Sequence, residues 1–365
     1  MSAVLQTRSP GRLRRLARSP LLRPFNDPVA IEGALQWLNP LWSLGQVRAR
    51  VLEVVEETPD VRTFVLAPNR HWRGAEAGQH VLVGMEVDGR RCQRAFSLSA
   101  PAARGGPLRL TVKRQPDAGV TAWMQAHLRP GAVVALSQAQ GGFVLPAAAP
   151  PRLLMIGAGS GITPLRAMLL ALRARGYDGD VVLLQACRDE ADAIFGAELD
   201  ALAAQWPALT LLRHRSADAG RLDAAALAAR VPDFAARTTF LCGPAAMMAW
   251  VEASYAEAGA QALLHRERFG LPPRPRAADD AEMQVRCTAS ERLFTSAGDT
   301  PLLLAAEAGG LQPRHGCRIG ICMSCQCRKR SGTVENLLTG RVSSAPDELI
   351  QLCISAARSD LELEL

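Results

Sequence analysis

No run of about eighteen uncharged apolar residues occurs in the 365-residue sequence, so we expect no membrane-spanning helix. Lysine is nearly missing, since Lys113 and Lys329 are the only two, and arginine supplies almost all of the positive charge. An even set of cysteines is also lacking, because there are nine and four of them lie between Cys317 and Cys327. This pattern excludes a secreted disulfide framework and favours a soluble, multidomain protein of a reducing compartment with a metal site.

The positive charge is concentrated at the start of the chain. Residues 1–30 hold six arginines and one acid, which is most of the formal net charge of +7. This leader lacks the apolar stretch of a secretory signal, and the sequence after Arg14 and Arg15 is not that of a twin-arginine signal. A transit peptide stays open as an alternative. We expect a cytoplasmic protein without a nucleic-acid partner, and weak peripheral contact of the leader with an anionic membrane is a hypothesis.

Composition divides the chain into five parts. Residues 1–45 are the Pro-punctuated leader, and residues 46–148 carry short alternating segments typical of an antiparallel β-barrel. Residues 149–271 alternate buried apolar strands with Ala/Leu-rich helices, which predicts an α/β domain with a parallel sheet. Residues 272–281 are a stiff Pro-rich linker, and residues 282–365 form a short mixed α+β unit.

The strongest signal is a loop of closely spaced cysteines. Cys317, Cys322 and Cys325 are separated by four and two residues, and Cys353 follows at a distance. This is the spacing of plant-type [2Fe–2S] ferredoxins, in which a short loop surrounds two irons. Small residues in such a loop let backbone N–H groups approach the sulfur atoms. We therefore predict that these four cysteines ligate a [2Fe–2S] cluster.

Two alternatives concern the same cysteines. A four-cysteine zinc site normally uses two pairs with short gaps, which this spacing does not provide. Cys327 lies just beyond the loop and is either a fifth ligand or a buried spectator thiol, of which we favour the second.

Phosphate- and flavin-binding residues are expected at the strand ends of the barrel. An arginine beside small hydroxyl residues, as in residues 94–97, suits a pyrophosphate and the edge of a flavin. A second strand ends at Lys113, and residues 119–123 begin a helix whose N-terminal amides can hold another phosphate. The predicted flavin site comprises Arg94, Phe96, Ser97, Lys113, Gly119 and Thr121.

A Gly-rich turn over residues 157–164 joins a buried strand to a helix. Its glycines let the backbone approach a pyrophosphate, although the spacing is not the G-x-G-x-x-G fingerprint. Two other strands end near Arg188 and Cys242, at the edge of the sheet where ligands of such folds bind. Arg188 is placed to reach the 2′-phosphate of NADPH. The predicted nucleotide site comprises Gly157, Gly159, Gly161, Thr163, Arg188, Cys242, Gly243 and Pro244.

Two helix starts are predicted from cap residues and proline. Thr163 is expected to cap the helix after the Gly-rich turn, with Pro164 in its first turn. Before the cysteine loop, Asp299 or Thr300 is expected to cap a helix of which Pro301 is the first residue.

These motifs together resemble the ferredoxin–NADP reductase superfamily fused to a C-terminal plant-type ferredoxin. The resemblance spans residues 46–365. Residues 94–97 are similar to the family's Arg-x-Tyr-Ser flavin motif, residues 157–164 to its nucleotide loop, and residues 242–244 to its Cys-Gly-Pro motif. Residues 265–269 are similar to the segment that brings an aromatic ring, here Phe269, to the flavin.

One departure from the family and one closer likeness stand out. Phe96 replaces the tyrosine of the flavin motif, which removes a hydroxyl group that would bond the flavin. The leader from Leu22 to Trp42 resembles the bacterial reductases that supply membrane fatty acyl desaturases.

The resemblance implies a flavin β-barrel, a nucleotide domain and a β-grasp ferredoxin domain. It implies hydride transfer from NADPH, or NADH, to FAD beside Ser97 and Cys242, and single-electron transfer through the [2Fe–2S] cluster to a partner. The expected partner is a membrane di-iron desaturase or another oxygenase. Alternatives are an NADH-dependent reductase component of a ring-hydroxylating or other multicomponent oxygenase, and a cluster-based redox sensor. Basic residues near the cysteine loop suggest that the partner has an acidic face: Arg314, His315, Arg318, Arg328, Lys329 and Arg330.

Overall fold

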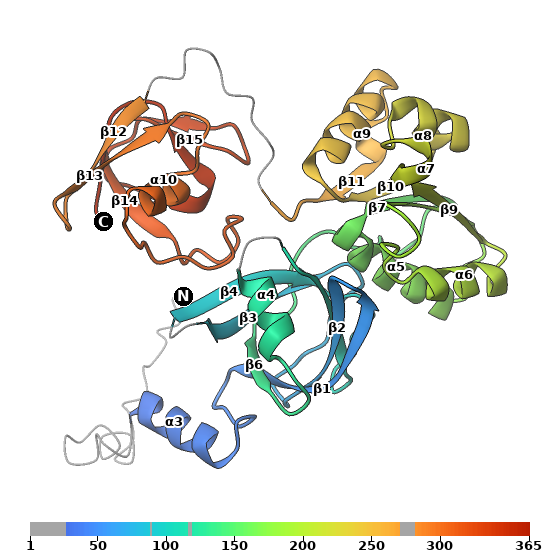
Figure 1. The fold of residues 1–365 in the computed structure, drawn as a ribbon, viewed down its shortest axis with the longest axis horizontal. Coiled ribbons are helices and arrows are strands. Elements are labelled where there is room, and N and C mark those ends of the chain that lie inside the picture. Colours follow the sequence, from blue (N-terminus) through green and yellow to red (C-terminus); the bar gives the residue numbers. More distant parts are fainter. Residues whose placement is uncertain (1–26, 88–89, 116–118, 271–281) are drawn as a thin grey trace, which may run out of the picture.

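The computed structural model describes residues 27–87, 90–115, 119–270 and 282–365, which form three sheet-based units (Figure 1). The predicted linker over residues 272–281 and the arginines of the leader lie outside the described residues. Within the described ranges, no helix has both the length and the apolar character needed to cross a bilayer.

The first unit is a closed antiparallel barrel with the strand order β4-β3-β6-β1-β2-β5. Its strands are β1 (Val47–Thr58), β2 (Val61–Pro68), β3 (His80–Val87), β4 (Arg90–Ser97), β5 (Leu108–Lys113) and β6 (Val133–Leu136). The two edges meet because Leu98, just after β4, pairs with Leu110 of β5, and the Ser99 N–H donates to the Arg109 carbonyl. Helix α4 (Val120–His127) follows Gly119 and packs beside β5. The predicted barrel is confirmed.

The second unit is a parallel sheet with the strand order β11-β10-β7-β8-β9. Its strands are β7 (Arg152–Ala158), β8 (Asp180–Cys187), β9 (Leu209–Arg215), β10 (Thr238–Cys242) and β11 (Leu264–Glu267). Alternate residues of β7 pack on opposite layers, as in a doubly wound fold. Leu153 and Met155 face α5 (Ile162–Ala174) and α6 (Gly196–Gln205), whereas Leu154 and Ile156 face α8 (Ala224–Arg230) and α9 (Ala245–Glu257). The predicted α/β domain is confirmed, and β11 is an additional strand that the sequence pattern did not indicate.

The third unit has a five-stranded sheet, β13-β12-β19-β14-β17, and a small sheet, β16-β15-β18. The strands of the first sheet are β12 (Glu282–Cys287), β13 (Arg292–Ala297), β14 (Gln326–Ser331), β17 (Glu348–Gln351) and β19 (Leu361–Leu363). Those of the second are β15 (Val334–Asn336), β16 (Val342–Ser343) and β18 (Ser355–Ala357). Helix α10 (Leu302–Ala308) buries Leu302, Leu303 and Ala306 in the core of this unit, so the predicted α+β unit is confirmed.

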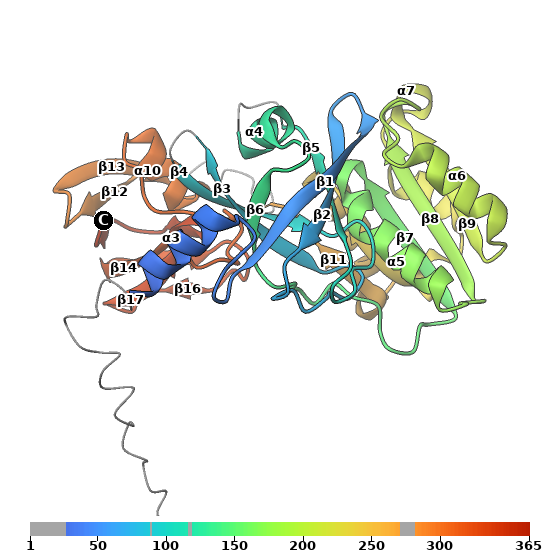
Figure 2. The same cartoon turned by 90° about the horizontal axis from the view of Figure 1, so that it is seen from below.

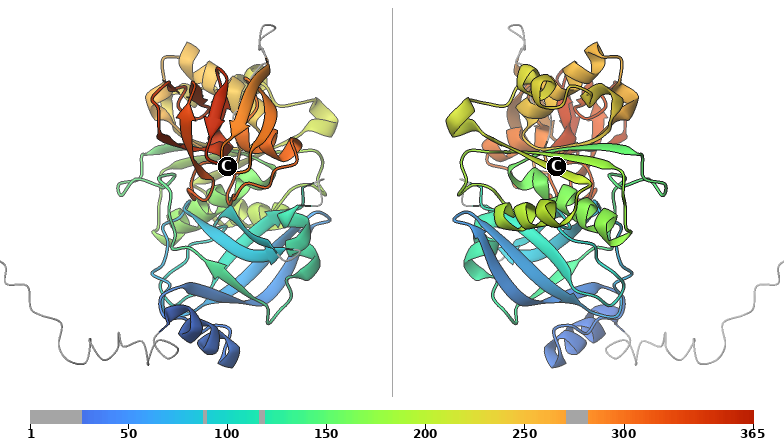
Figure 3. Two further views of the ribbon diagram at one scale, coloured as in Figure 1. Left: turned by 90° about the vertical axis from the view of Figure 1, so that its left-hand side faces the viewer. Right: turned by 90° about the vertical axis from the view of Figure 1, so that its right-hand side faces the viewer.

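The barrel contacts both of the other units. Figures 1 and 3 show the C-terminal unit and the parallel-sheet unit above the barrel, and Figure 2 shows the barrel between these two units along the long axis. Side-chain hydrogen bonds cross both boundaries, from Arg94 to Gly316 and from Lys113 to Asp192. The strand ends that carry the predicted motifs are therefore brought to one region of the molecule.

A short helix precedes the barrel where only a Pro-punctuated leader was expected. This helix, α3 (Pro28–Leu38), begins with the Asp27 side chain, which accepts a hydrogen bond from the Val29 N–H at 2.9 Å, and has Pro28 at its first position. Both are favourable start signals. None of its residues is buried.

Both predicted helix caps are wrong. A 3₁₀ turn over Gly159–Gly161 leads directly into α5, so Gly161 takes the cap position and the Thr163 hydroxyl donates to the Ser160 carbonyl from inside the first turn. In α10, Pro301 itself takes the cap position, with extended backbone, and no side chain caps the helix. In both cases the helix is present as predicted, but its first turn begins one or two residues away from the position that the sequence indicated.

Candidate functional site

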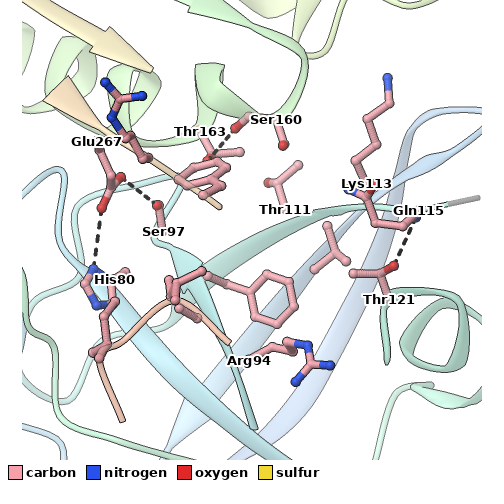
Figure 4. Close-up of a pocket in the computed structure, with 17 residues that line it drawn as sticks. His80, Arg94, Ser97, Thr111, Lys113, Gln115, Thr121, Ser160, Thr163 and Glu267 are labelled. Carbon is pink, nitrogen blue, oxygen red and sulfur yellow. Dashed lines mark hydrogen bonds and ion pairs between the residues drawn. The ribbon is translucent and has the colours of Figure 1, made fainter. Parts of the chain in front are cut away.

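A cavity of about 380 Å³ lies where the three units meet (Figure 4). This size suits a flavin ring system, because ligand cavities span roughly 300–1,000 Å³. Its walls come from the barrel, from the turn before α5, from the segment after β11 and from the cysteine loop. Seven of the residues predicted for cofactor binding line it: Arg94, Phe96, Ser97, Lys113, Thr121, Thr163 and Phe269.

The other predicted nucleotide and flavin residues do not line this cavity. They are Gly119, Gly157, Gly159, Gly161, Arg188, Cys242, Gly243 and Pro244. Gly161 has a packing reason for its identity, since a Cβ atom there would lie 2.1 Å from the Cys242 carbonyl oxygen. The Gly-rich turn thus packs closely on the end of β10, which brings two of the predicted nucleotide motifs together at one edge of the sheet.

A chain of three polar side chains in contact crosses from the barrel to the parallel sheet (Figure 4). The Ser97 hydroxyl donates to Glu267 at 3.0 Å, and the other Glu267 oxygen lies 3.5 Å from His80 Nδ1. All three residues line the cavity. These contacts join the barrel to the end of β11 at the wall of the cavity.

The sequence did not single out His80 or Glu267. Glu267 ends β11 and pairs in register with Cys242 of β10. Its only signal was its place inside the family-like segment over residues 265–269, and a lone histidine at a strand start carries no spacing pattern.

Cys242 is fully buried at the carboxyl end of β10. Burial, and then the negative charge of Glu267, raise the pKa of its thiol well above the ordinary value. The thiol is therefore uncharged at neutral pH and acts as a packing surface rather than as a thiolate nucleophile.

Asp192 joins the predicted flavin residue Lys113 to the predicted nucleotide residue Arg188. Its carboxylate accepts hydrogen bonds from Lys113 Nζ at 2.9 Å, from Arg188 Nη2 at 3.0 Å and from the Arg188 N–H at 3.1 Å. Burial alone would raise the pKa of Asp192, but the hydrogen bonds from Arg188 and Lys113 outweigh it and lower this pKa to about 2. The Arg188 side chain is otherwise 71% exposed, as a residue that meets a mobile ligand would be.

We predict that replacing Asp192 by asparagine lowers the free energy of unfolding by about 2 kcal/mol at pH 7. The folded pKa of about 2 lies below the ordinary 3.8, so the ionised group stabilises the fold above about pH 4. That contribution is lost as the pH falls towards 2, and the gap between the two proteins should narrow from pH 4 to pH 3 in urea titrations. Glu190→Gln, an exposed acid nearby, is the control. If the difference in unfolding free energy between the wild type and Asp192→Asn does not change with pH, ionised Asp192 does not stabilise the fold in this way.

Arg94 connects the flavin motif to the cysteine loop. Its guanidinium donates to the carbonyl of Gly316, the residue before Cys317. Burial, and then the charge of Arg318, lower the pKa of Arg94. Ile319 and Ile321, which lie between two of the loop cysteines, form part of the cavity wall. The cysteine loop and the proposed flavin cavity are therefore in direct contact.

The four cysteines of the predicted cluster lie as two pairs. The Cys317 N–H donates to Cys322 Sγ at 3.2 Å, and Cys317 Sγ accepts from the N–H groups of Ile321 at 3.2 Å and Cys322 at 3.3 Å. In the second pair, a hydrogen bond from Cys353 lowers the pKa of Cys325 to about 6. Within the described residues no group of three metal-binding side chains is arranged around a single ion. Two pairs lined by N–H donors suit a binuclear cluster better than one zinc ion.

Cys327 differs from these four cysteines. Its thiol donates to the carbonyls of Arg328 and Glu364, each at 3.6 Å, and burial raises its pKa to about 11. This geometry suits the spectator role favoured above.

The structure removes one of the basic residues near the loop from the docking face that the sequence suggested, while Arg314 and Arg330 remain exposed. Lys329 is fully buried, and its ammonium group donates to the carbonyls of Gly332 and Ser343. Arg318 is paired with Glu307 at 2.6 Å, and Arg330 with Asp347 at 2.6 Å. The prediction for Lys329 is wrong because alternate residues of β14 face the interior.

Comparisons with known proteins agree with this architecture. Three domain families match in order: an oxidoreductase FAD-binding domain over residues 48–144, an oxidoreductase NAD-binding domain over residues 155–253, and a 2Fe-2S iron-sulfur cluster binding domain over residues 286–358. An NADPH oxidoreductase of Mycobacterium tuberculosis is 37% identical over 347 residues, covering 93% of this chain and 90% of that protein. The chain belongs to the ferredoxin–NADP reductase superfamily, with a C-terminal [2Fe–2S] domain.

Other members of the superfamily share the whole three-domain arrangement. The ferredoxin reductase component of 3-ketosteroid-9-alpha-monooxygenase from M. tuberculosis is 33% identical, covering 85% of this chain and 93% of that protein. The structure of phthalate dioxygenase reductase superposes with a TM-score of 0.62 at 23% identity, over 88% of this chain and 98% of that one, which shows the shared fold. The present protein is thus an NAD(P)H-dependent oxidoreductase that carries FAD and a [2Fe–2S] cluster.

Proposed function

We propose that this protein takes electrons from NADPH and delivers them, by way of FAD and a [2Fe–2S] cluster, to a membrane fatty acyl desaturase. One observation carries the electron path. A single cavity is lined by the flavin motif, by Thr163 of the nucleotide turn and by Ile319 and Ile321 of the cysteine loop. This shared cavity supports a path in which the domains proposed over residues 46–148, 149–271 and 282–365 would exchange electrons at a flavin held there.

Each domain has a positioning task. The nicotinamide supplies a hydride, FAD stores two electrons and the cluster releases them singly. Arg94 and Lys113 offer positive charge to the flavin phosphates, and the Gly-rich turn and the start of α5 offer backbone N–H groups to the nucleotide pyrophosphate. Ser97, Phe96 and Phe269 form the walls that hold the reacting rings together and limit water.

We assign the cluster to Cys317 and Cys322 as one pair and to Cys325 and Cys353 as the other. The backbone N–H groups that point at the first pair stabilise negative charge on the sulfur atoms. The contact of Arg94 with Gly316 keeps this loop against the flavin cavity.

NADPH preference rests on Arg188. We predict that Arg188→Ala lowers kcat/KM for NADPH by about tenfold and leaves kcat/KM for NADH within about twofold, because an exposed charge-assisted hydrogen bond to the 2′-phosphate is lost. Steady-state ferricyanide reduction with each nucleotide measures this. Arg173→Ala, an exposed arginine in the last turn of α5, is not expected to change either value. Equal losses for both nucleotides, or none, remove Arg188 from the nucleotide site.

The acceptor is tested by reconstitution. The protein and NADPH are mixed with a purified membrane desaturase or with a soluble oxygenase component, and product formation is measured for each. The proposal fails if only the oxygenase turns over. NADPH-driven reduction of the cluster in anaerobic stopped flow, as expected, would count against a cluster-based redox sensor.

A second candidate acceptor has its own support. Several relatives are reductase components of oxygenases by name, among them the glycine betaine monooxygenase reductase subunit of Chromohalobacter salexigens, which is 28% identical over 363 residues. A soluble oxygenase is therefore the alternative partner, with NADH as an alternative donor. The desaturase proposal adds a cytoplasmic location and peripheral contact with the inner face of a membrane.

A further inference from the structure

Helix α3 turns an apolar side to solvent and keeps Ile31, Leu35 and its polar residues half-buried. Its only polar side chains after the cap, Glu32 and Gln36, lie on the half-buried side. Glu32 accepts hydrogen bonds from Gln36 at 2.7 Å and from the Leu44 N–H at 2.9 Å, so its charge is engaged internally. The outward side is entirely apolar and consists of Val29, Ala30, Gly33, Ala34, Trp37 and Leu38.

The exposure of this side is large for single apolar residues. Trp37 is 85% exposed and Val29 is 78% exposed. Trp42 and Leu44, just after the helix, are 52% and 54% exposed and continue the same apolar segment. A surface helix normally turns its apolar stripe inward, so a stripe that faces outward needs a partner.

We propose that the outward side of α3, together with Trp42 and Leu44, inserts into the interfacial layer of an anionic membrane. Three observations favour lipid over protein. Tryptophan side chains suit the boundary between headgroups and acyl chains. No acidic side chain lies on the outward side, and six arginines occur in the 27 residues that precede the helix in sequence. Eleven residues span only about 16 Å, which is small for a stable interface with a second copy.

The place of α3 in the molecule allows such contact. The helix projects from the barrel on the side away from the parallel sheet and its covering helices (Figures 1 and 3). The segment after it is fixed to the barrel, since Asn69 Nδ2 donates to the Leu41 carbonyl at 3.0 Å and His71 Nε2 lies 2.9 Å from the Ser43 carbonyl oxygen. Insertion of α3 would therefore hold the barrel at the lipid surface without closing the cavity.

This inference rests on the membrane contact proposed above, and its test separates the two. The full-length protein, Trp37→Gln/Leu38→Gln and a form lacking residues 1–23 are sedimented with phosphatidylglycerol-containing and pure phosphatidylcholine vesicles at low and high salt. The matched control is Leu293→Gln, because Leu293 is 64% exposed on another unit and Leu38 is 65% exposed. Ferricyanide reduction by NADPH checks that each variant is folded.

We expect the double variant to bind anionic vesicles about tenfold or more weakly than the wild type, and Leu293→Gln to bind like the wild type. Wild-type protein should keep residual binding at high salt, where the attraction of the arginines is screened, and the double variant should not. Brominated lipids should quench tryptophan fluorescence of the wild type more than that of the double variant.

Two other results overturn the inference in different ways. Equal binding by the wild type and the double variant, with loss only on deletion of residues 1–23, leaves the leader contact standing and removes α3 from it. No vesicle binding by any form removes both. If in that case the wild type dimerises and the double variant does not, the outward side of α3 covers a second copy of the chain.

Discussion

Replacing Cys322 by serine is expected to abolish the visible and paramagnetic signals of the cluster and to lower cytochrome c reduction by about 100-fold or more, which is about 2.7 kcal/mol of barrier. Cys322 lies beside Cys317, whose N–H donates to its sulfur atom at 3.2 Å, so one ligand of the first pair is lost. Ferricyanide reduction by NADPH should stay within about twofold, because ferricyanide takes electrons before the cluster.

The matched control is Cys327→Ser, the same substitution two residues beyond Cys325. Cys327 is buried and donates only to backbone carbonyls, so the cluster signals should remain. Loss of the signals in this control would make Cys327 a ligand. Equal losses of ferricyanide and cytochrome c reduction in Cys322→Ser would show that the flavin and the cluster do not act in series.

Alternation in the sequence predicts barrel strands over residues 47–55, 62–66, 80–87 and 108–113, of which the first two are longer in the structure. Strands β3 (His80–Val87) and β5 (Leu108–Lys113) have the bounds that their apolar pattern indicated, because each covers the barrel core on one face. Strand β11 escaped prediction since its four residues, at the edge of the sheet, are exposed or half-buried and show no apolar run. Alternation of apolar and polar residues indicates a strand with one buried face, so it cannot indicate an edge strand that has no buried face.

Seven of the residues that the sequence predicted for cofactor binding line one cavity, and their function there stays a prediction. The flavin motif and Thr163 line the same cavity because strand ends and helix starts of neighbouring domains lie together there. Glu267 and Asp192 were not singled out because their roles depend on contacts distant in sequence, across 170 residues to Ser97 and across 79 residues to Lys113. Nothing in a linear sequence reveals such pairs without the fold.

Charge patterns in the sequence were the least reliable guide. The run over residues 328–330 was read as a basic surface, yet it forms part of a strand in which the middle residue faces the interior. The outward apolar side of α3 was not predicted either, because the sequence indicated only a Pro-punctuated leader there. In both cases the fold determines which side of an element faces solvent.

The second large effect is expected at Ser97, where the hydroxyl group joins two domains at the reacting edge. Its hydrogen bond to Glu267 spans from β4 of the barrel to the end of β11, beside Cys242. Ser97→Ala removes this bond and leaves Glu267 with His80 alone, 3.5 Å away. A small misplacement of reacting groups costs roughly 100-fold in rate, so we expect reduction of the flavin by NADPH to slow by about that factor.

Anaerobic stopped flow, with the loss of flavin absorbance as the signal, measures the effect, and the FAD content of each protein is read from its spectrum. Ser99→Ala is the matched control: Ser99 is also buried, but its hydroxyl group bonds only inside the barrel, to Thr111 and to the Arg109 carbonyl. Ser97→Thr keeps a hydroxyl group and should recover most of the rate. Equal slowing in the two alanine variants would reduce Ser97 to a structural residue. A normal rate in Ser97→Ala would mean that the bond to Glu267 does not align the two domains for hydride transfer.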